Sequence, residues 1–427
     1  MDLPRSRPGG RSLEKVEIAV AIHNQGTTGP RAGPKPVGAN NPADTKGCRS
    51  EVSAPKVFLT QCDAYDREVV QQKVEEAFAA FGGVGTYATA GSRVLVKPNL
   101  LAGAPPQRAV TTHPAVVEAA LKLLLEAGAK VTVADSPGFS SAAKVAAKSG
   151  IAEVAHRLGV EIAELDESVE VSAPGGSLFR KVEVARAALE ADAIINLAKF
   201  KTHGQMILTM AVKNLFGCVV GHRKAQWHMA AGIDRDAFAR LLLELWRLLP
   251  RTFSLVDGIV AMDGNGPSAG RARAMNLLLA GEDALAVDRI AARLVGLAEN
   301  RFPLVRAARQ IDELGPSLGH IDVVGGSVEA LAVDDFELPA GSDIALGPRI
   351  LRRVFGRALS ARPKVNRRKC RLCGICVESC PPQAMTMAGG RVSIDYSACI
   401  SCFCCQEMCP ERAIDVRRGW LAKVIIH

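Results

Sequence analysis

The sequence has 427 residues, which is enough for two or three domains. Its hydrophobic content is 48%, but no apolar run approaches the roughly 18 residues of a membrane helix and no signal-peptide pattern opens it, so we expect a cytoplasmic protein without stable membrane insertion. The net charge of +9 lies mostly at the C-terminus: residues 336–427 hold 15 Lys/Arg and 7 Asp/Glu, whereas residues 56–335 hold 30 and 32. A nucleic-acid partner is therefore not expected.

The first 55 residues are predicted to form a disordered N-terminal extension. They are rich in Gly, Pro, Arg, Asn and Thr, and they show no sustained hydrophobic periodicity. Ordered patterning begins only at Lys56. A start codon assigned upstream of the true one explains the same pattern equally well.

Residues 56–335 alternate between strand-like and helical patterns. Strand-like runs lie at 57–60, 94–98, 130–135, 193–197 and 253–257, and helical stretches lie at about 65–81, 114–127, 141–158, 234–249 and 283–296. This alternation predicts an α/β domain with a mostly parallel, doubly wound sheet. The segment 169–184 resembles a hairpin that interrupts the alternation.

Polar residues follow the strand-like runs of this domain. They are Lys97, Asn99, Asp135, Lys199, Lys201, His203, Lys213, Asp257 and Asp263. Because open α/β sheets bind ligands beyond the carboxyl ends of their strands, we expect these residues to share one crevice. The lysines and His203 would suit a carboxylate or phosphate, while the aspartates would serve as counter-charges, metal ligands or proton donors.

We take Lys97, Lys199, Lys201, His203 and Asp263 as the candidate catalytic residues. Taken singly, a loop lysine or histidine is more often solvated than catalytic, so the prediction rests on the set. Two further aspartates, Asp283 and Asp288, are ambiguous, because Asp283 also fits the first turn of a helix. No P-loop sequence is present.

A basic linker is predicted at 336–363. Between Arg349 and Arg371 there are ten basic residues and no acidic ones. Ile350, Leu351, Val354, Phe355 and Leu359 recur at helical spacing, which indicates a short basic amphipathic helix. Its basic face would be solvated, would dock an acidic redox partner, or would touch a membrane surface, in that order of preference.

Nine of the 12 cysteines lie between residues 370 and 409, in two runs with the same spacing. The ligand positions are Cys370, Cys373, Cys376 and Cys380 in the first run and Cys399, Cys402, Cys405 and Cys409 in the second, each 29 residues after its counterpart. A proline follows the last cysteine of both runs. Such triplets with a terminal Cys-Pro are not the paired C-x2-C pattern of a zinc site, and they indicate metal rather than a disulfide scaffold.

Three closely spaced thiolates can hold three corners of a 4Fe–4S cube, and the Cys-Pro of the other run supplies the fourth. The expected ligands are Cys370, Cys373, Cys376 and Cys409 for one cluster and Cys399, Cys402, Cys405 and Cys380 for the other. Cys404 is then an extra thiol, which we expect to be a packed spectator.

Residues 364–418 resemble the bacterial two-cluster ferredoxins, and a tail follows at 419–427. The strings Val-Lys-Pro-Asn-Leu, Thr-Thr-His-Pro, Lys-Phe-Lys-Thr-His, Ala-Val-Lys-Asn-Leu-Phe-Gly and Gly-Asn-Gly-Pro, within about 56–330, resemble the "domain of unknown function 362" family. Many members of that family similarly look fused to a C-terminal ferredoxin module. The resemblance implies an architecture and a site location but no reaction.

The leading functional hypothesis is an iron–sulfur oxidoreductase that passes low-potential electrons from a partner protein to an anionic small molecule in the α/β domain. One alternative is a non-catalytic electron-transfer or maturation partner. Another is a non-redox body domain whose clusters are structural or sensory.

Overall fold

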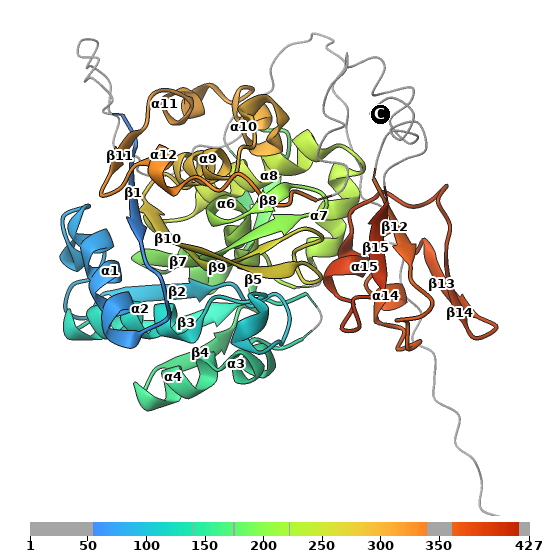
Figure 1. Ribbon diagram of the computed structural model, residues 1–427, viewed down its shortest axis with the longest axis horizontal. Coiled ribbons are helices and arrows are strands. Elements are labelled where there is room, and N and C mark those ends of the chain that lie inside the picture. Colours follow the sequence, from blue (N-terminus) through green and yellow to red (C-terminus); the bar gives the residue numbers. More distant parts are fainter. Residues whose placement is uncertain (1–53, 139, 174–175, 222, 340–360, 418–427) are drawn as a thin grey trace, which may run out of the picture. The chain divides into compact units, whose positions relative to one another are not determined.

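The computed structural model describes residues 54–138, 140–173, 176–221, 223–339 and 361–417 (Figure 1). The predicted N-terminal extension up to residue 53, the predicted basic helix within 340–360 and the tail at 419–427 lie outside these residues. Within the described ranges, no helix has the length and apolar character needed to cross a bilayer.

A mixed, mostly parallel sheet forms the centre of the body, in the strand order β11-β1-β10-β9-β7-β2-β3-β4, with β8 beside β7. The strands are β1 (Lys56–Gln61), β2 (Arg93–Pro98), β3 (Lys130–Asp135), β4 (Glu161–Glu164), β7 (Ala193–His203), β8 (Ile207–Thr209), β9 (Thr252–Asp263), β10 (Arg271–Gly281) and β11 (Asp322–Val324). The run β9-β7-β2-β3-β4 is parallel, and β10 is antiparallel to both of its neighbours. The predicted α/β class is confirmed.

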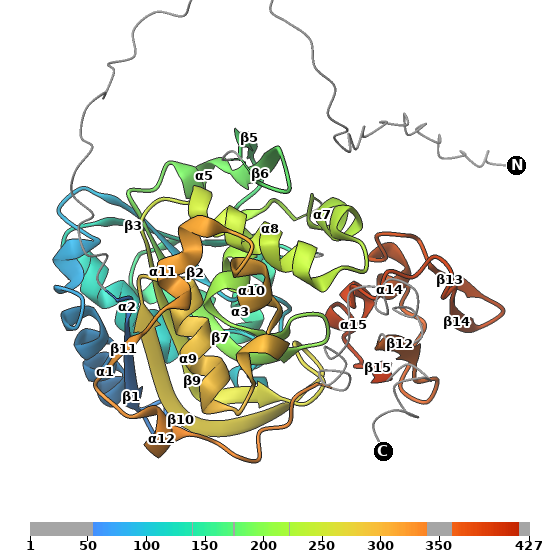
Figure 2. The same cartoon turned by 90° about the horizontal axis from the view of Figure 1, so that it is seen from above.

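Helices cover both faces of this sheet (Figures 1 and 2). They are α1 (Arg67–Ala79), α2 (Pro114–Glu126), α3 (Ala142–Ser149), α4 (Ile151–Arg157), α5 (Arg186–Leu189), α6 (Ala211–Asn214), α7 (Arg223–Ala231), α8 (Arg235–Leu248), α9 (Ala284–Leu294), α10 (Pro303–Ala308), α11 (Gly315–Leu318) and α12 (Val328–Leu331). Val94 and Val96 of β2 pack in a core with α1 and α2, whereas Leu95 packs in the core of α8 and α9. Because side chains alternate along a strand, covering both faces buries the whole strand, and every residue of β7 is buried.

Local signals fix where the helices begin and end. Asp66 accepts hydrogen bonds from the first turn of α1, and Asp283 does the same for α9, so Asp283 is an N-cap. Asp288 accepts the backbone N–H groups of Ala211 and Val212, which begin α6. The single helix expected at 141–158 is two helices, because Gly150 adopts a left-handed φ of 77° between α3 and α4.

Two smaller units accompany the sheet. The expected hairpin is formed by β5 (Ser168–Ser172) and β6 (Lys181–Ala185), which pair antiparallel. The cysteine module is a small α+β unit of β12 (Arg362–Val365), α14 (Ile375–Glu378), β13 (Met385–Ala388), β14 (Arg391–Ile394), α15 (Cys404–Glu407) and β15 (Ile414–Arg417). Pairing of β12 with β15 joins the two ends of the module.

Candidate functional site

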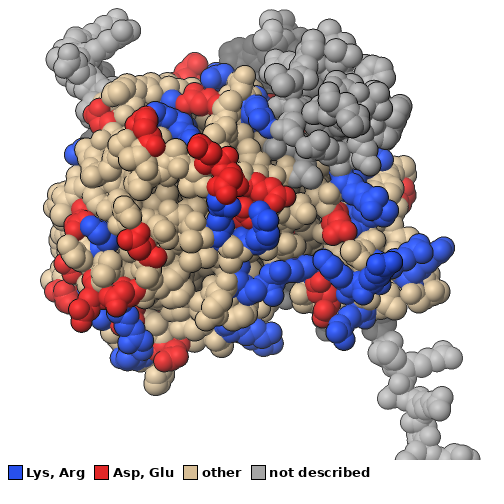
Figure 3. Space-filling model, viewed as in Figure 1, with Lys and Arg blue, Asp and Glu red and all other residues tan. Residues whose placement is uncertain are grey.

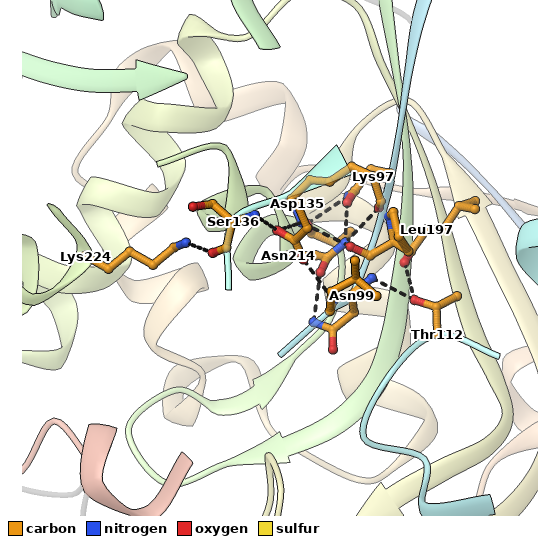
Figure 4. Close-up of polar contacts among 12 residues, drawn as sticks. Lys97, Asn99, Thr112, Asp135, Ser136, Leu197, Asn214 and Lys224 are labelled. Atoms are coloured by element: carbon orange, nitrogen blue, oxygen red, sulfur yellow. Dashed lines mark hydrogen bonds and ion pairs between the residues drawn. The ribbon is translucent and has the colours of Figure 1, made fainter. Parts of the chain in front are cut away.

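Strands β2 and β3 end in a buried ion pair. Nζ of Lys97 lies 2.9 Å from Oδ1 of Asp135, and both side chains are almost completely buried (Figure 4). Asp135 also accepts the backbone N–H groups of Leu100 (2.9 Å) and Ser136 (2.8 Å). Gly217 permits this arrangement, because a Cβ there would lie 2.0 Å from Oδ1 of Asp135 and 2.3 Å from Nζ of Lys97. The ion pair is therefore confined by the backbone on one side.

A chain of side-chain amides lies beside this pair, and Asn214 donates to the backbone carbonyl of Lys97 at 3.3 Å. Lys201 donates to Oδ1 of Asn99 (2.8 Å), Asn99 donates to Oδ1 of Asn214 (2.9 Å), and Asn214 donates to Oδ1 of Asn196 (2.8 Å). Burial, and then the charge of Lys213, lowers the pKa of Lys201 to about 7. Lys201 can thus exchange a proton near neutral pH while the amides hold its position.

A cavity of about 320 Å³ opens beside these groups, and both the body and the cysteine module line it. The body contributes Lys97, Asn99, Leu100, Leu101, Asp135, Ser136, Pro137, Gly138, Lys201, Thr209, Lys213, Asn214, Phe216, Gly217, Gly221, Lys224, Ala225, His228 and Pro267; the module contributes Glu378, Ser379, Cys404, Glu407 and Met408. Four of these residues are lysines, and three carboxylate residues, Asp135, Glu378 and Glu407, line the cavity with them.

Two buried polar atoms of the cavity wall have no hydrogen-bond partner among the described residues. They are Nδ1 of His228 and Oγ of Ser379, and these residues are 4% and 2% exposed. Burial lowers the pKa of His228 to about 3, so its ring is neutral. The ammonium group of Lys213 also forms no hydrogen bond or ion pair within the described part of the chain; it lies 5.9 Å from the ring centroid of Phe216. Orphaned buried polar groups are costly, and a bound ligand would satisfy them.

Lys224 of α7 is a second lysine with an altered pKa. Its ammonium group donates to the backbone carbonyl of Ser136. Burial lowers its pKa to about 8, although the negative charge of Asp135 opposes this effect. The wall therefore holds two lysines that change charge between pH 7 and 8.

Lys199 does not line the cavity. Its Nζ lies 2.7 Å from Oδ2 of Asp257 and donates to the hydroxyl of Tyr65 at 2.8 Å. Tyr65 in turn donates to Oδ1 of Asp257 and stacks on His113, with ring centroids 3.5 Å apart. The charges of Lys199 and Asp257 compensate each other in this buried cluster.

His203 joins the body to the module. Its Nδ1 accepts the backbone N–H groups of Gln205 and Met206, both at 3.1 Å, so its proton is on Nε2. Nε2 then donates to Oε1 of Glu407 at 2.5 Å. Burial opposes ionisation of Glu407, but the charge of Lys213 and the hydrogen bond from His203 outweigh it and lower the pKa of this carboxyl group. Burial and then the charge of Lys213 lower the pKa of His203 to about 4, so the imidazole is a neutral donor with both nitrogens occupied.

Helix α15 makes further contacts with the body. Gln406 donates to the carbonyl of Asn265 (3.0 Å), and its own carbonyl accepts the hydroxyl of Ser268 (3.1 Å). Phe403 is 1% exposed and adopts a left-handed φ of 63°. A Cβ on Gly204 would lie 3.1 Å from its ring. An alanine at 204 would therefore require the Phe403 ring to shift by a few tenths of an ångström.

Asp263 also lies outside the cavity wall. Oδ2 of Asp263 is 3.1 Å from Nη2 of Arg271 and 3.7 Å from Nη1 of Arg273, across the β9–β10 pair. The structure therefore brings Lys97 and Lys201 of the candidate catalytic set to the cavity, and it places Lys199, His203 and Asp263 in ion pairs or hydrogen bonds elsewhere.

The cysteines of the two runs intermingle. Cys370, Cys373, Cys376 and Cys409 line one small pocket. Cys405 lies among thiols of both sets: burial, and then the thiols of Cys402, Cys380, Cys399 and Cys376, raise its pKa well above the usual value. In the described chain, no three His, Cys, Asp or Glu side chains converge on a single-ion site. Each group of four thiols has the donor chemistry that an iron–sulfur cluster requires.

Backbone groups support the terminal cysteine of each run. Sγ of Cys380 accepts the N–H of Ala384, and Sγ of Cys409 accepts the N–H of Ala413, both at 3.2 Å. The two contacts repeat the 29-residue symmetry of the sequence. Hydrogen bonds to sulfur are one means by which a protein tunes the potential of a bound cluster.

The sequence analysis did not predict several residues that line the cavity. Lys224 and His228 lie on a helix rather than after a strand, and Ser379 and Glu407 belong to the module. Cys404, which the sequence analysis took for a packed spectator, also lines the cavity. The sequence offered one usable signal: Cys404 breaks the otherwise regular cysteine pattern.

Comparison with known proteins shows the family to which the chain belongs. A family model described as "Domain of unknown function (DUF362)" matches residues 94–293, and a "4Fe-4S dicluster domain" model matches residues 362–410. The thylakoid-associated protein sll1697 of Synechocystis is 36% identical over 302 residues, which are 70% of this chain and 93% of that protein.

Two solved structures are more distant. A Thermotoga maritima protein shares 16% identity at a TM-score of 0.34, over 48% of this chain and 53% of that chain. The lactate racemase apoprotein of Thermoanaerobacterium thermosaccharolyticum shares 13% at 0.38, over 57% of each chain. From the family models and the Synechocystis relative, the chain belongs to the domain-of-unknown-function-362 family and carries a C-terminal 4Fe–4S dicluster domain.

Proposed function

We propose that this protein is an iron–sulfur oxidoreductase that passes low-potential electrons to a small anionic substrate held in the 320 Å³ cavity. The observation that carries the proposal is the shared wall: lysines of the body and residues flanking the cysteine ligands surround one space. An electron-transfer module and an anion site that merely coexisted in one chain would not need a common wall.

Two clusters would be held by the two sets of four cysteines, Cys370, Cys373, Cys376 and Cys409, and Cys399, Cys402, Cys405 and Cys380. When bound, they would supply one-electron transfer at low potential. The fit rests on the donor set itself, four thiols in each group, with the N–H groups of Ala384 and Ala413 directed at two of the sulfurs.

The chain's own residues would bind and orient the substrate. Within the described residues Lys213 forms no ion pair, although its charge also acts on Glu407, and its ammonium group would meet the anion. Oγ of Ser379 and Nδ1 of His228, which have no partner among those residues, would hydrogen-bond it. Lys201, with a pKa of about 7, would hold or release a proton beside it. Phe216 and Leu100 line the same wall and would exclude water.

Anaerobic purification with iron and sulfide quantification tests the cofactor assignment. We expect about eight of each per chain for two cubes. Cys376→Ser should lose about half, and Cys404→Ser should lose none. Equal losses in the two variants would contradict the ligand assignment.

Mass spectrometry of small molecules that co-purify with the holoprotein tests the substrate site. Lys213→Ala should lose a co-purifying carboxylate or phosphate compound, whereas Lys122→Ala, on the far surface of α2, should retain it. An anion held equally by both variants would place the binding site outside the cavity.

A non-catalytic electron-transfer or maturation partner is the second candidate, supported by the excess positive charge of residues 336–427. It predicts that no small molecule occupies the cavity and that Lys213→Ala leaves electron exchange with a protein partner unchanged. Cytoplasmic localisation remains a prediction of the sequence.

A further inference from the structure

The two halves of the cysteine module contain the same turn before their first ligand. The side chain of Asn366 accepts the N–H of residue 368 (3.2 Å), and that of Asp395, 29 residues later, accepts the N–H of residue 397 (2.8 Å). The backbone carbonyls of Asn366 and Asp395 each accept the N–H of the following ligand, Cys370 or Cys399, at 3.0 Å. Both turns are closed by the same pair of hydrogen bonds.

The sequences inside these turns differ sharply in charge. The first holds Arg367, Arg368 and Lys369, and the second holds Tyr396, Ser397 and Ala398. All three cations are exposed, and none of their side chains has an ion-pair partner within the described residues. Because the second turn forms without a cation, the charges of the first are not required by its geometry.

These cations border one of the two cysteine groups. Residues 367–369 immediately precede Cys370, and Arg371 lines the same pocket as Cys370, Cys373, Cys376 and Cys409. Lys and Arg side chains gather over the module in Figure 3. Cys373 is itself exposed. We call Cys370, Cys373, Cys376 and Cys409 the outer group.

The other group lies toward the cavity. Cys404, between ligands Cys402 and Cys405, and Ser379, next to ligand Cys380, both line the cavity wall. Cys402 and Cys405 are each 6% exposed. This inner group is thus adjacent to the proposed substrate site, and two of its four cysteines, Cys402 and Cys405, are shielded from solvent.

We propose that the basic loop, Asn366–Arg371, is the docking site for an acidic electron-carrier protein, which exchanges electrons at the outer group. One electron would leave the reduced carrier, which is thereby oxidised, and would enter the 4Fe–4S cluster that the outer group would hold, which is thereby reduced. This inference rests on the proposed function, because electron exchange at this site requires bound 4Fe–4S clusters. It adds the partner's chemistry and assigns different roles to the two halves of the duplication.

The second turn supplies the test variant. Arg367→Tyr, Arg368→Ser and Lys369→Ala together copy the uncharged turn into the first position. Lys130→Ala, Lys144→Ala and Lys148→Ala together are the control, since they remove three exposed charges from the body. Reconstituted holoproteins are mixed in a stopped-flow apparatus with a reduced, acidic plant-type [2Fe–2S] ferredoxin, and bleaching of the cluster absorption is followed.

At low ionic strength we expect the second-order rate constant to fall at least tenfold in the loop variant and less than twofold in the control, the loss shrinking as salt is added. Photoreduced deazaflavin should reduce all three proteins equally, which shows that the clusters themselves are intact. Equal rate constants with ferredoxin would overturn the inference. So would loss of binding to phosphatidylserine vesicles with no change in that rate constant, because the loop would then be a lipid-binding site. A wild-type protein without cluster absorption would refute the proposed function instead.

Discussion

Removing one partner of the buried ion pair of Lys97 and Asp135 is expected to lower the free energy of unfolding of the body strongly. We predict that Lys97→Met destabilises the body by about 3–5 kcal/mol, because it leaves the carboxylate of Asp135 in a site that is 5% exposed, without its cation at 2.9 Å. Methionine retains most of the volume of lysine, so loss of packing contributes little. The remaining N–H donors, of Leu100 and Ser136, satisfy part of the carboxylate but do not neutralise it.

Urea unfolding of anaerobically prepared holoprotein, followed by far-UV circular dichroism, measures this loss. The double variant Lys97→Met with Asp135→Asn should be more stable than Lys97→Met alone, since the uncompensated charge is gone. Lys122→Met should cost less than about 1 kcal/mol, because Lys122 is half-exposed and its buried partner Glu118 keeps Arg157 at 2.8 Å. A loss below about 1 kcal/mol for Lys97→Met, or a double variant less stable than the single, would refute the reasoning.

Three other predictions concern single positions. Between pH 7 and 10.5 the unfolded chain keeps the Lys201 proton that the folded chain has released, so this lysine makes the free energy of unfolding rise with pH. Lys201→Met should flatten that rise in urea midpoints measured across this pH range. An unchanged slope would contradict the lowered pKa. Phe403→Gly introduces the residue found at the equivalent position 29 residues earlier, Gly374. We expect this variant to keep its iron content while backbone hydrogen exchange at 403–408 becomes faster. Unchanged exchange would mean that Phe403 does not anchor α15. Asp283→Ala should cost about 0.5–2 kcal/mol in the same urea assay through the lost N-cap of α9, and Asp312→Ala, which caps no long helix, is its control; equal effects would argue against capping.

The sequence predicted the fold class well because its strongest signals are local. Alternating apolar runs identified β1, β2, β3, β7 and β9 to within a few residues, apart from the far ends of β7 and β9. The strand β10 was missed, since Arg271-Ala-Arg-Ala-Met-Asn lacks a continuous apolar run and the strand is irregular between Ala274 and Leu277. Gly150 could have signalled the break between α3 and α4, because a glycine within a helical pattern is a frequent helix end.

The site was predicted only in part, for a different physical reason. Lys199, Lys201 and His203 alternate along β7, so period two puts them on one face. The register of β7 against β9 shifts between Lys199 and Lys201, and each side chain meets its own partner: Asp257, Asn99 and Glu407. Glu407 is 204 residues from His203, and no local pattern reveals a contact between such distant positions.

Under the proposed function, the shared wall of the cavity would make substrate retention depend on the state of the module. Ser379, Cys404 and Glu407 follow or lie between cysteine ligands, so whatever fixes those cysteines also fixes one side of the cavity. Oxygen damage that dismantled the clusters would release that side and weaken the hold on the anion. A damaged copy would then return its substrate to solution, where an intact copy could bind it, instead of sequestering it in a site that cannot react.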